Sequence, residues 1–218
     1  MKKNKTIVLL SGGIDSATTL FLAKKQSLTV NALVFDYGQK HKKEIRFAKQ
    51  IAKIAKVKYK IVRVRMPWSR SSLTDKAKKV PENFSDKIPS TYVPGRNIIF
   101  LSYAVSFAES IKADSIFIGA HTQDYSGYPD CRKVFLENFN QAINLGIAGK
   151  AIKFRYPLIN KNKKEIIQLG LKLGVPFEYT WSCYNGRKQP CLKCESCRFR
   201  VNAFKQLGLK DPLLKNKK

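Results

Sequence analysis

The sequence predicts an α/β fold built on a doubly wound, mainly parallel sheet of five strands. Short apolar runs, of the kind that form buried strands, alternate along the chain with segments whose apolar residues recur every three or four positions. Polar loops follow several of these apolar runs. This arrangement is typical of βαβ units, in which ligands bind beyond the carboxyl ends of the strands.

Five strands are expected, with helices between them and one long loop. The apolar runs place strands at residues 6–10, 30–35, 59–64, 115–119 and 152–156. Helices are expected at residues 17–25, 42–56, 95–111 and 133–145, and a loop followed by a helix at residues 157–174. Asn97 is the expected N-cap of the third helix, and Gly174 the expected C-cap of the last. Residues 67–94 lack periodicity and predict a long loop.

The chain is strongly basic. Its 42 lysines and arginines against 15 aspartates and glutamates give a formal net charge of +27 over 218 residues. This charge suits nucleic-acid binding, but lysine drift in an AT-rich genome explains it too, and we favour drift because the lysines form no aromatic-interleaved block. There is no run of about 18 apolar residues, so we expect no membrane span and a cytoplasmic protein.

The turn Ser11–Ser16, with the sequence SGGIDS, follows the first expected strand and opens the first helix. Paired glycines let backbone N–H groups approach an anion, and the helix N-terminus favours negative charge. The turn is therefore a candidate phosphate-binding loop, in which Asp15 is either a Mg²⁺ partner or a cap for the loop's own amides. A well-capped strand–helix turn without a ligand is the alternative.

The SGGIDS turn resembles the SGGxDS motif of the PP-loop ATP pyrophosphatases and stands in the same place, after the first strand. The resemblance implies an adenine nucleotide alpha-hydrolase-like fold and cleavage of ATP to AMP and pyrophosphate. It implies an ATP site formed by the following residues: Leu9, Leu10, Ser11, Gly12, Gly13, Ile14, Asp15, Ser16, Phe35 and Tyr37.

Four of the five cysteines lie close together, at Cys183, Cys191, Cys194 and Cys197. Their C-x7-C-x2-C-x2-C spacing suits one tetrahedral Zn²⁺ with no open position, which predicts a structural site. An iron–sulfur cluster and a catalytic redox pair remain open as alternatives. We therefore divide the chain into a nucleotide-binding α/β domain, residues 1–180, and a C-terminal four-cysteine zinc segment with a helix, residues 181–218, packed on the same domain.

Taken together, the motifs resemble the 7-cyano-7-deazaguanine synthase family of queuosine biosynthesis over nearly the whole chain. Besides the first loop, the matching stretches are VFDYGQKH, VPGRNIIFLSYA, GAHTQDYSGYPDCR, PLINKNKKEI and TWSCYNG with the cysteines that follow. The resemblance implies a ligase that uses ATP with Mg²⁺ to convert 7-carboxy-7-deazaguanine and ammonia to the nitrile. It also implies a homodimer, and direct nucleic-acid binding is not required.

The resemblance also suggests roles for individual residues. Asp15, Lys163 and Arg96 are the candidate catalytic residues, and Lys163 is expected to neutralise charge on the α-phosphate. The loop after the fourth strand is the candidate deazaguanine site, formed with the helix start by Arg96, Asp124, Tyr125, Tyr128, Asp130 and Arg132. Without the resemblance, a solvated lysine and an ordered loop with aspartate caps would explain Lys163 and these loop residues.

Two rival interpretations stay open at this point. The first is a PP-loop enzyme that modifies tRNA directly, by thiolation or lysidine-type ligation, which the positive charge and the paired cysteines support. The second is a zinc-containing nucleic-acid binding module without catalytic activity, which leaves the SGGIDS turn unexplained.

Overall fold

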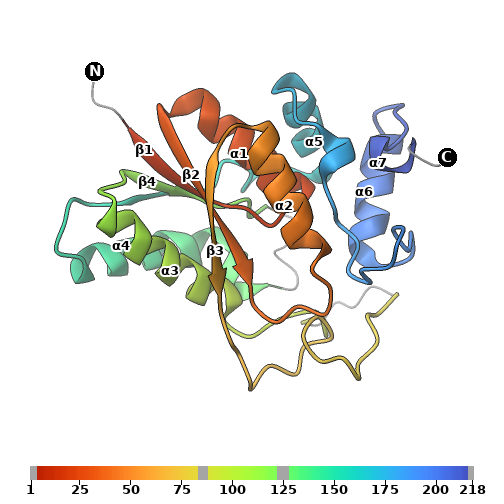
Figure 1. Ribbon diagram of the computed structural model, residues 1–218, viewed down its shortest axis with the longest axis horizontal. Helices are drawn as coiled ribbons and strands as arrows, with labels where there is room; N and C mark the ends of the chain where they lie inside the picture. Colours follow the sequence, from red (N-terminus) through yellow and green to blue (C-terminus); the bar gives the residue numbers. More distant parts are fainter. Residues whose placement is uncertain (1–3, 83–87, 122–127, 216–218) are drawn as a thin grey trace.

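The computed structural model describes residues 4–82, 88–121 and 128–215. Its centre is a five-stranded sheet in the order β3-β2-β1-β4-β5, with every neighbouring pair parallel (Figure 1). The predicted doubly wound parallel sheet is thereby confirmed. The strands are β1 (Lys5–Leu9), β2 (Thr29–Asp36), β3 (Lys58–Arg63), β4 (Ser115–Phe117) and β5 (Lys153–Arg155).

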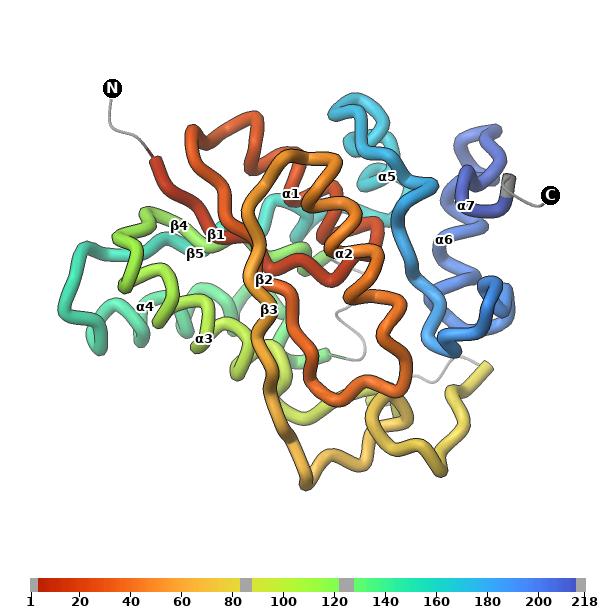
Figure 2. Tube along the Cα trace, viewed as in Figure 1, coloured from red at the N-terminus to blue at the C-terminus, as the bar shows by residue number. Residues whose placement is uncertain are grey.

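Helices cover both faces of the sheet, as the tube view shows (Figure 2). On one face lie α1 (Ile14–Gln26), α2 (Lys43–Ile54) and α5 (Lys163–Lys172), and on the other α3 (Arg96–Ser110) and α4 (Lys133–Gly146). The short 3-10 helix η2 (Pro129–Cys131) precedes α4. The C-terminal part of the chain adds η3 (Phe177–Tyr179), α6 (Glu195–Lys205) and α7 (Pro212–Lys215).

Alternation along the central strand produces the two cores. Ile7 and Leu9 of β1 pack toward α3 and α4, whereas Val8 between them packs toward α1, α2 and α5. Successive strand side chains point to opposite faces, so a strand covered on both sides is apolar throughout. The order of the strands reverses at β1, because β2 lies on one side of it and β4 on the other. Ligand sites in such sheets form at this point, outside the carboxyl ends of the strands.

Two helix ends differ in detail from the prediction. Asn97 is not the N-cap of α3, because Gly95 holds that position with a φ of 63°. The Asn97 amide instead donates to Asp130 Oδ2 at 2.9 Å, so a carboxylate from η2 caps the helix. At the end of α5 the C-cap is Leu173, and Gly174 follows with a φ of 72° in a Schellman motif closed by the bond from Val175 N to Gly170 O.

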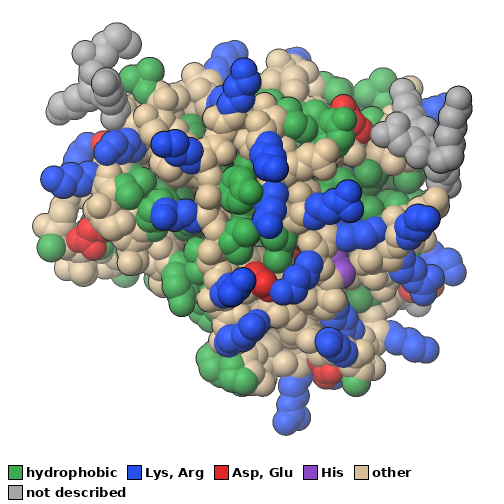
Figure 3. All heavy atoms as spheres, in the orientation of Figure 1, with side chains coloured by type: hydrophobic (Ala, Val, Ile, Leu, Met, Phe, Trp, Pro, Cys, Tyr) green, Lys and Arg blue, Asp and Glu red, His purple; other side chains and the backbone are tan. Residues whose placement is uncertain are grey.

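The basic charge is spread over the surface. Figure 3 shows lysine and arginine side chains across the whole visible face, without a single continuous stripe. Within the described ranges, no helix has both the length and the apolar character needed to cross a membrane.

Candidate active site

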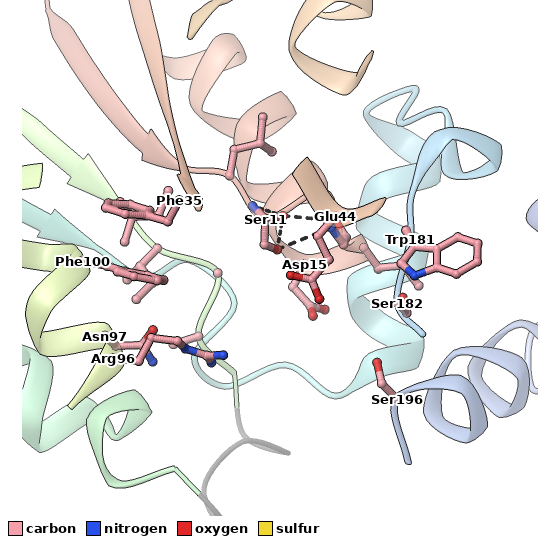
Figure 4. Close-up of a pocket in the computed structure, with 18 of the residues that line it drawn as sticks. Ser11, Asp15, Phe35, Glu44, Arg96, Asn97, Phe100, Trp181, Ser182 and Ser196 are labelled. Carbon is pink, nitrogen blue, oxygen red and sulfur yellow. Dashed lines mark hydrogen bonds between the residues drawn. The ribbon is translucent and has the colours of Figure 1, made fainter. Parts of the chain in front are cut away.

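The SGGIDS turn forms a compact loop between β1 and α1. Ser16 Oγ lies 3.0 Å from Ser11 Oγ and donates to Gly13 O at 3.2 Å, which draws the loop back on itself (Figure 4). Gly13 is the N-cap of α1 and supplies no side chain to cap the helix. The first amides of a helix have no partner within it, so this uncapped N-terminus favours an anion.

Gly12 has a packing role rather than a cavity-lining one. A Cβ atom there would lie 2.6 Å from both Ala48 N and Glu44 O, because the backbone of α2 packs directly on the loop. Its φ of 84° is also a conformation that other residues rarely adopt. Gly12 therefore sets the distance between α2 and the loop.

Replacing Gly12 with alanine is expected to lower the free energy of unfolding by about 3 kcal/mol, since overpacking and a left-handed backbone each cost about 1–3 kcal/mol. Gly146→Ala is the matched control: Gly146 ends α4, and nothing lies within 4 Å of a Cβ built there. Urea unfolding of both variants measures the difference. Equal midpoints for the two variants would contradict this account of Gly12.

A charged cluster lies beside the loop. Lys163, the first residue of α5, donates to Asp15 Oδ1 and Oδ2 at 2.7 and 2.9 Å, and its Nζ lies 3.0 Å from His121 Nε2. Burial raises the pKa of Asp15, but the charges and hydrogen bonds of Lys163 and His121 outweigh burial and hold this pKa well below its usual value.

The loop and the cluster line a cavity of about 250 Å³ at the carboxyl ends of β1, β2 and β4. Of the predicted site residues, the structure brings these to the cavity wall: Leu9, Leu10, Ser11, Gly13, Ile14, Asp15, Ser16, Phe35, Tyr37, Arg96, Tyr128 and Lys163. Gly12, Asp130 and Arg132 do not line it. Asp124 and Tyr125 lie outside the described residues.

Asp130 and Arg132 lie at the starts of helices and not in the cavity wall. The Asp130 carboxylate is buried and accepts from the Asn97 backbone and, at 3.3 Å, from the Asn97 side chain. Arg132 is exposed and is the N-cap residue of α4. The described geometry therefore gives Asp130 a helix-capping role, and substrate binding by Asp130 and Arg132 stays a prediction.

Arg96 brings a positive charge into the cavity from the first turn of α3 (Figure 4). Its guanidinium lies 5.6 Å from the ring centroid of Tyr37, and Nη1 is 3.5 Å from the Tyr37 hydroxyl. Nearby, Phe35 and Phe100 stack with centroids 4.0 Å apart. This side of the cavity thus combines flat apolar surface with one cation, which suits a planar, anionic ligand.

Sequence reasoning missed several cavity residues. Glu44 of α2 reaches the cavity, and burial raises its pKa to about 7 even though the positive charge of Arg96 opposes the rise. The other wall is formed by residues of the C-terminal part, among them Trp181, Ser182 and Ser196 (Figure 4). The stretch TWSCY was recognised only as a matching segment, because nothing local in it indicates a cavity wall.

The four predicted metal ligands come together in space. The sulfur atoms of Cys183, Cys191, Cys194 and Cys197 all lie within 4.8 Å of one another. A tetrahedral Zn²⁺ with bonds of about 2.3 Å needs sulfurs about 3.8 Å apart, so the cluster fits such an ion. The amides of Cys191 and Cys194 donate to Cys183 Sγ and Cys191 Sγ, both at 3.3 Å, as expected for sulfurs that carry thiolate charge.

The cysteine cluster is linked directly to the loop. Trp181 N donates to Gly12 O at 2.8 Å, and the Trp181 indole N–H donates to Cys183 O at 2.8 Å. The ammonium of Lys43 lies 4.3 Å from the centre of the Trp181 ring. The segment that leads into the cysteines therefore forms both the cavity wall and a support for the loop.

The five-stranded parallel sheet, with the SGGIDS loop at the N-terminus of α1, defines a protein of the PP-loop type. NMN synthetase from Francisella tularensis superimposes with a TM-score of 0.52 at 16% identity, covering 95% of this chain and 78% of the other. A predicted subunit of tRNA methyltransferase from Methanocaldococcus jannaschii gives 0.51 at 14% identity, covering 95% and 91%. At these identities the likeness concerns the fold alone.

The sequence model of the family described as Queuosine biosynthesis protein QueC matches residues 5–208, and the chain belongs to this family. A 7-cyano-7-deazaguanine synthase of Clostridium kluyveri is 50% identical over 218 residues, covering 96% of each chain. One from Nostoc punctiforme is 47% identical over 221 residues, covering 96% of this chain and 99% of the relative.

Proposed function

We propose that the chain is an ATP-dependent carbon–nitrogen ligase that converts 7-carboxy-7-deazaguanine and ammonia to 7-cyano-7-deazaguanine, a precursor in queuosine biosynthesis. Membership of the QueC family supports this substrate. The observation that supports the chemistry is the contact of Lys163 with Asp15 beside an uncapped helix N-terminus, because a cation next to free helix amides suits phosphate binding.

The reaction needs the same activation twice. A carboxylate is a poor electrophile, so transfer of AMP from ATP to its oxygen creates a leaving group and releases pyrophosphate. Ammonia displaces AMP and forms the amide. A second transfer of AMP, now to the amide oxygen, permits elimination to the nitrile. One cavity can serve both steps, because each aims a carbonyl oxygen at the α-phosphorus of ATP.

The residue roles follow from the cavity. We propose that the loop from Ser11 to Ser16 holds the pyrophosphate, that Asp15 holds Mg²⁺, and that Lys163 neutralises charge on the α-phosphate. Leu9, Leu10, Phe35 and Tyr37 complete the ATP site in this proposal. Arg96 and Tyr128 face the same space and are the described residues we propose for the deazaguanine carboxylate and ring.

Three further proposals complete this function. The fit of the four sulfur atoms supports one structural Zn²⁺ per chain. Clustered thiols suited to a metal are typical of a reducing compartment, which supports a cytoplasmic location. We also propose a homodimer, as the family resemblance implies; light scattering of the purified protein tests this directly.

The alternative is direct modification of tRNA by a PP-loop enzyme. The family match does not favour it. The two are separated by incubating purified, zinc-loaded protein with ATP, Mg²⁺, ammonium and 7-carboxy-7-deazaguanine. We expect the nitrile by mass spectrometry, with AMP and pyrophosphate. Unchanged deazaguanine together with modified tRNA in a parallel reaction would overturn the proposal.

A further inference from the structure

Glu44 is a carboxylate in the cavity without a structural task. It lies in the first turn of α2, is half-buried and lines the cavity together with Asp15 (Figure 4). Among the described residues it receives no side-chain hydrogen bond, and no cationic nitrogen lies within 4.0 Å of it, whereas both oxygens of Asp15 are bound by Lys163. Glu44 is thus the acidic cavity residue still able to accept a proton.

The proposed reaction has a need that the loop and Lys163 do not meet. Nitrogen must lose protons when ammonia forms the amide and again when the activated amide becomes a nitrile. Cations and helix amides stabilise phosphate charge but accept no proton. On the basis of the proposed function, we propose that the Glu44 carboxylate is the proton acceptor for the nitrogen atom in both steps.

The electron balance is simple in each step. In the first, the nitrogen lone pair forms the C–N bond, an N–H proton moves to a Glu44 oxygen, and AMP leaves with the electrons of its C–O bond. In the second, transfer of AMP to the amide oxygen leaves an imidate nitrogen that carries two protons. One proton moves to Glu44 and gives the neutral imidate. The electrons of the remaining N–H bond then become the third C–N bond as that proton moves to Glu44, and AMP leaves with the electrons of its C–O bond. The carboxyl group returns each proton to solvent between steps.

The surroundings of Glu44 suit this task. Burial raises the pKa of Glu44 to about 7, and the positive charge of Arg96 opposes part of this rise. The pKa therefore lies near neutral pH, where a general base is most effective. The titratable or charged side chains that share the cavity wall are Asp15, Tyr37, Arg96, Tyr128, Cys131, Lys163, Tyr184 and Arg200. Of these, Arg96 is the positive charge acting on Glu44, and it keeps the ionised form accessible near neutral pH.

The test separates proton transfer from ATP chemistry. Exchange of labelled pyrophosphate into ATP, dependent on 7-carboxy-7-deazaguanine and run without ammonia, reports the first adenylation alone. Glu44→Gln is expected to keep this exchange within about twofold of wild type and to lower kcat for amide and nitrile formation about 10²- to 10³-fold. Glu44→Asp should recover part of the loss. Glu137→Gln, an exposed carboxylate of α4 outside the cavity, is the control.

Each outcome has one meaning. Wild-type protein without exchange contradicts the proposed function itself. If wild type exchanges, three results with Glu44→Gln overturn the present inference: unchanged nitrile formation, an equal loss of exchange, or a raised KM for ammonia with unchanged kcat, which would indicate an ammonium-binding group. Retained exchange with a lowered kcat supports the inference.

Stability and pH provide a check that does not depend on the variant's activity. Because folding raises the pKa of Glu44, its ionised form is disfavoured in the folded protein, so stability rises as the pH falls from about 7 toward the unfolded value. The neutral Glu44→Gln variant should therefore unfold at pH 8 at a temperature no lower than wild type.

The pH dependence of the wild-type reaction is a second check. At constant free ammonia, the rate of nitrile formation should decrease as the pH falls below about 7, while pyrophosphate exchange persists. Exchange and nitrile formation with the same pH profile would overturn the inference.

Discussion

Replacing Lys163 with alanine is expected to lower kcat/KM for nitrile formation about 10³-fold. The ammonium is bound by Asp15 of the loop and lies in the cavity wall, and one preorganised group of this kind contributes about 10²- to 10³-fold in comparable sites. Its loss also leaves the Asp15 carboxylate without its main counter-charge, which raises the pKa of Asp15. Steady-state kinetics with varied ATP, together with pyrophosphate exchange, measure the effect.

The exchange reaction distinguishes Lys163 from Glu44, because Lys163→Ala should lose exchange and nitrile formation together. Lys172→Ala is the matched control: Lys172 belongs to the last turn of the same helix, is exposed and does not line the cavity. A Lys163→Ala variant within about tenfold of wild type would show that phosphate charge is neutralised elsewhere.

Loss of a cysteine ligand is expected to remove both the metal and the activity. Structural zinc sites have apparent binding energies of about 10–16 kcal/mol, comparable to the whole stability of a domain. In Cys194→Ser the segment from Trp181 to Cys197 should lose its fold, and with it the cavity wall and the bond from Trp181 to Gly12. We expect nitrile formation to become undetectable and the unfolding temperature to fall.

Elemental analysis, thermal unfolding and the ligase assay measure the three consequences. Cys131→Ser is the control for metal content, since Cys131 lies outside the four-cysteine cluster and should leave one zinc per chain. A Cys194→Ser protein that keeps stoichiometric zinc and its unfolding temperature would refute the structural role. Iron in the wild-type protein would instead identify the metal site as an iron–sulfur centre.

The sheet could be predicted because buried parallel strands consist of short apolar runs, which can be recognised in the sequence alone. The strands β1, β2 and β4 are mainly apolar and buried, and β1 is followed at once by the polar loop, whereas β3 and β5 at the sheet edges carry lysine and arginine and are less distinct in the sequence. The metal cluster could be predicted for a similar reason, because four cysteines lie within fifteen residues at a spacing typical of metal sites. The division of the chain after residue 180 stays a prediction.

Residues whose role depends on distant partners were not predictable in the same way. Glu44 lies at the start of an amphipathic helix, where a charged residue is usually exposed to solvent. Its side chain lines the cavity because α2 packs on the loop at Gly12. Asp130 caps a helix that starts more than thirty residues earlier, and its place in a polar loop gives no sign of that partner. Lys163 became a candidate through family resemblance, not through its own lysine-rich surroundings.

The hydrogen bond between Trp181 and Gly12 joins the loop after the first strand to the segment that leads into the cysteines, far along the sequence. A ribosome therefore finishes nearly the entire chain before a working catalyst exists, and a premature stop codon or proteolytic cut ahead of the cysteines leaves an inert fragment.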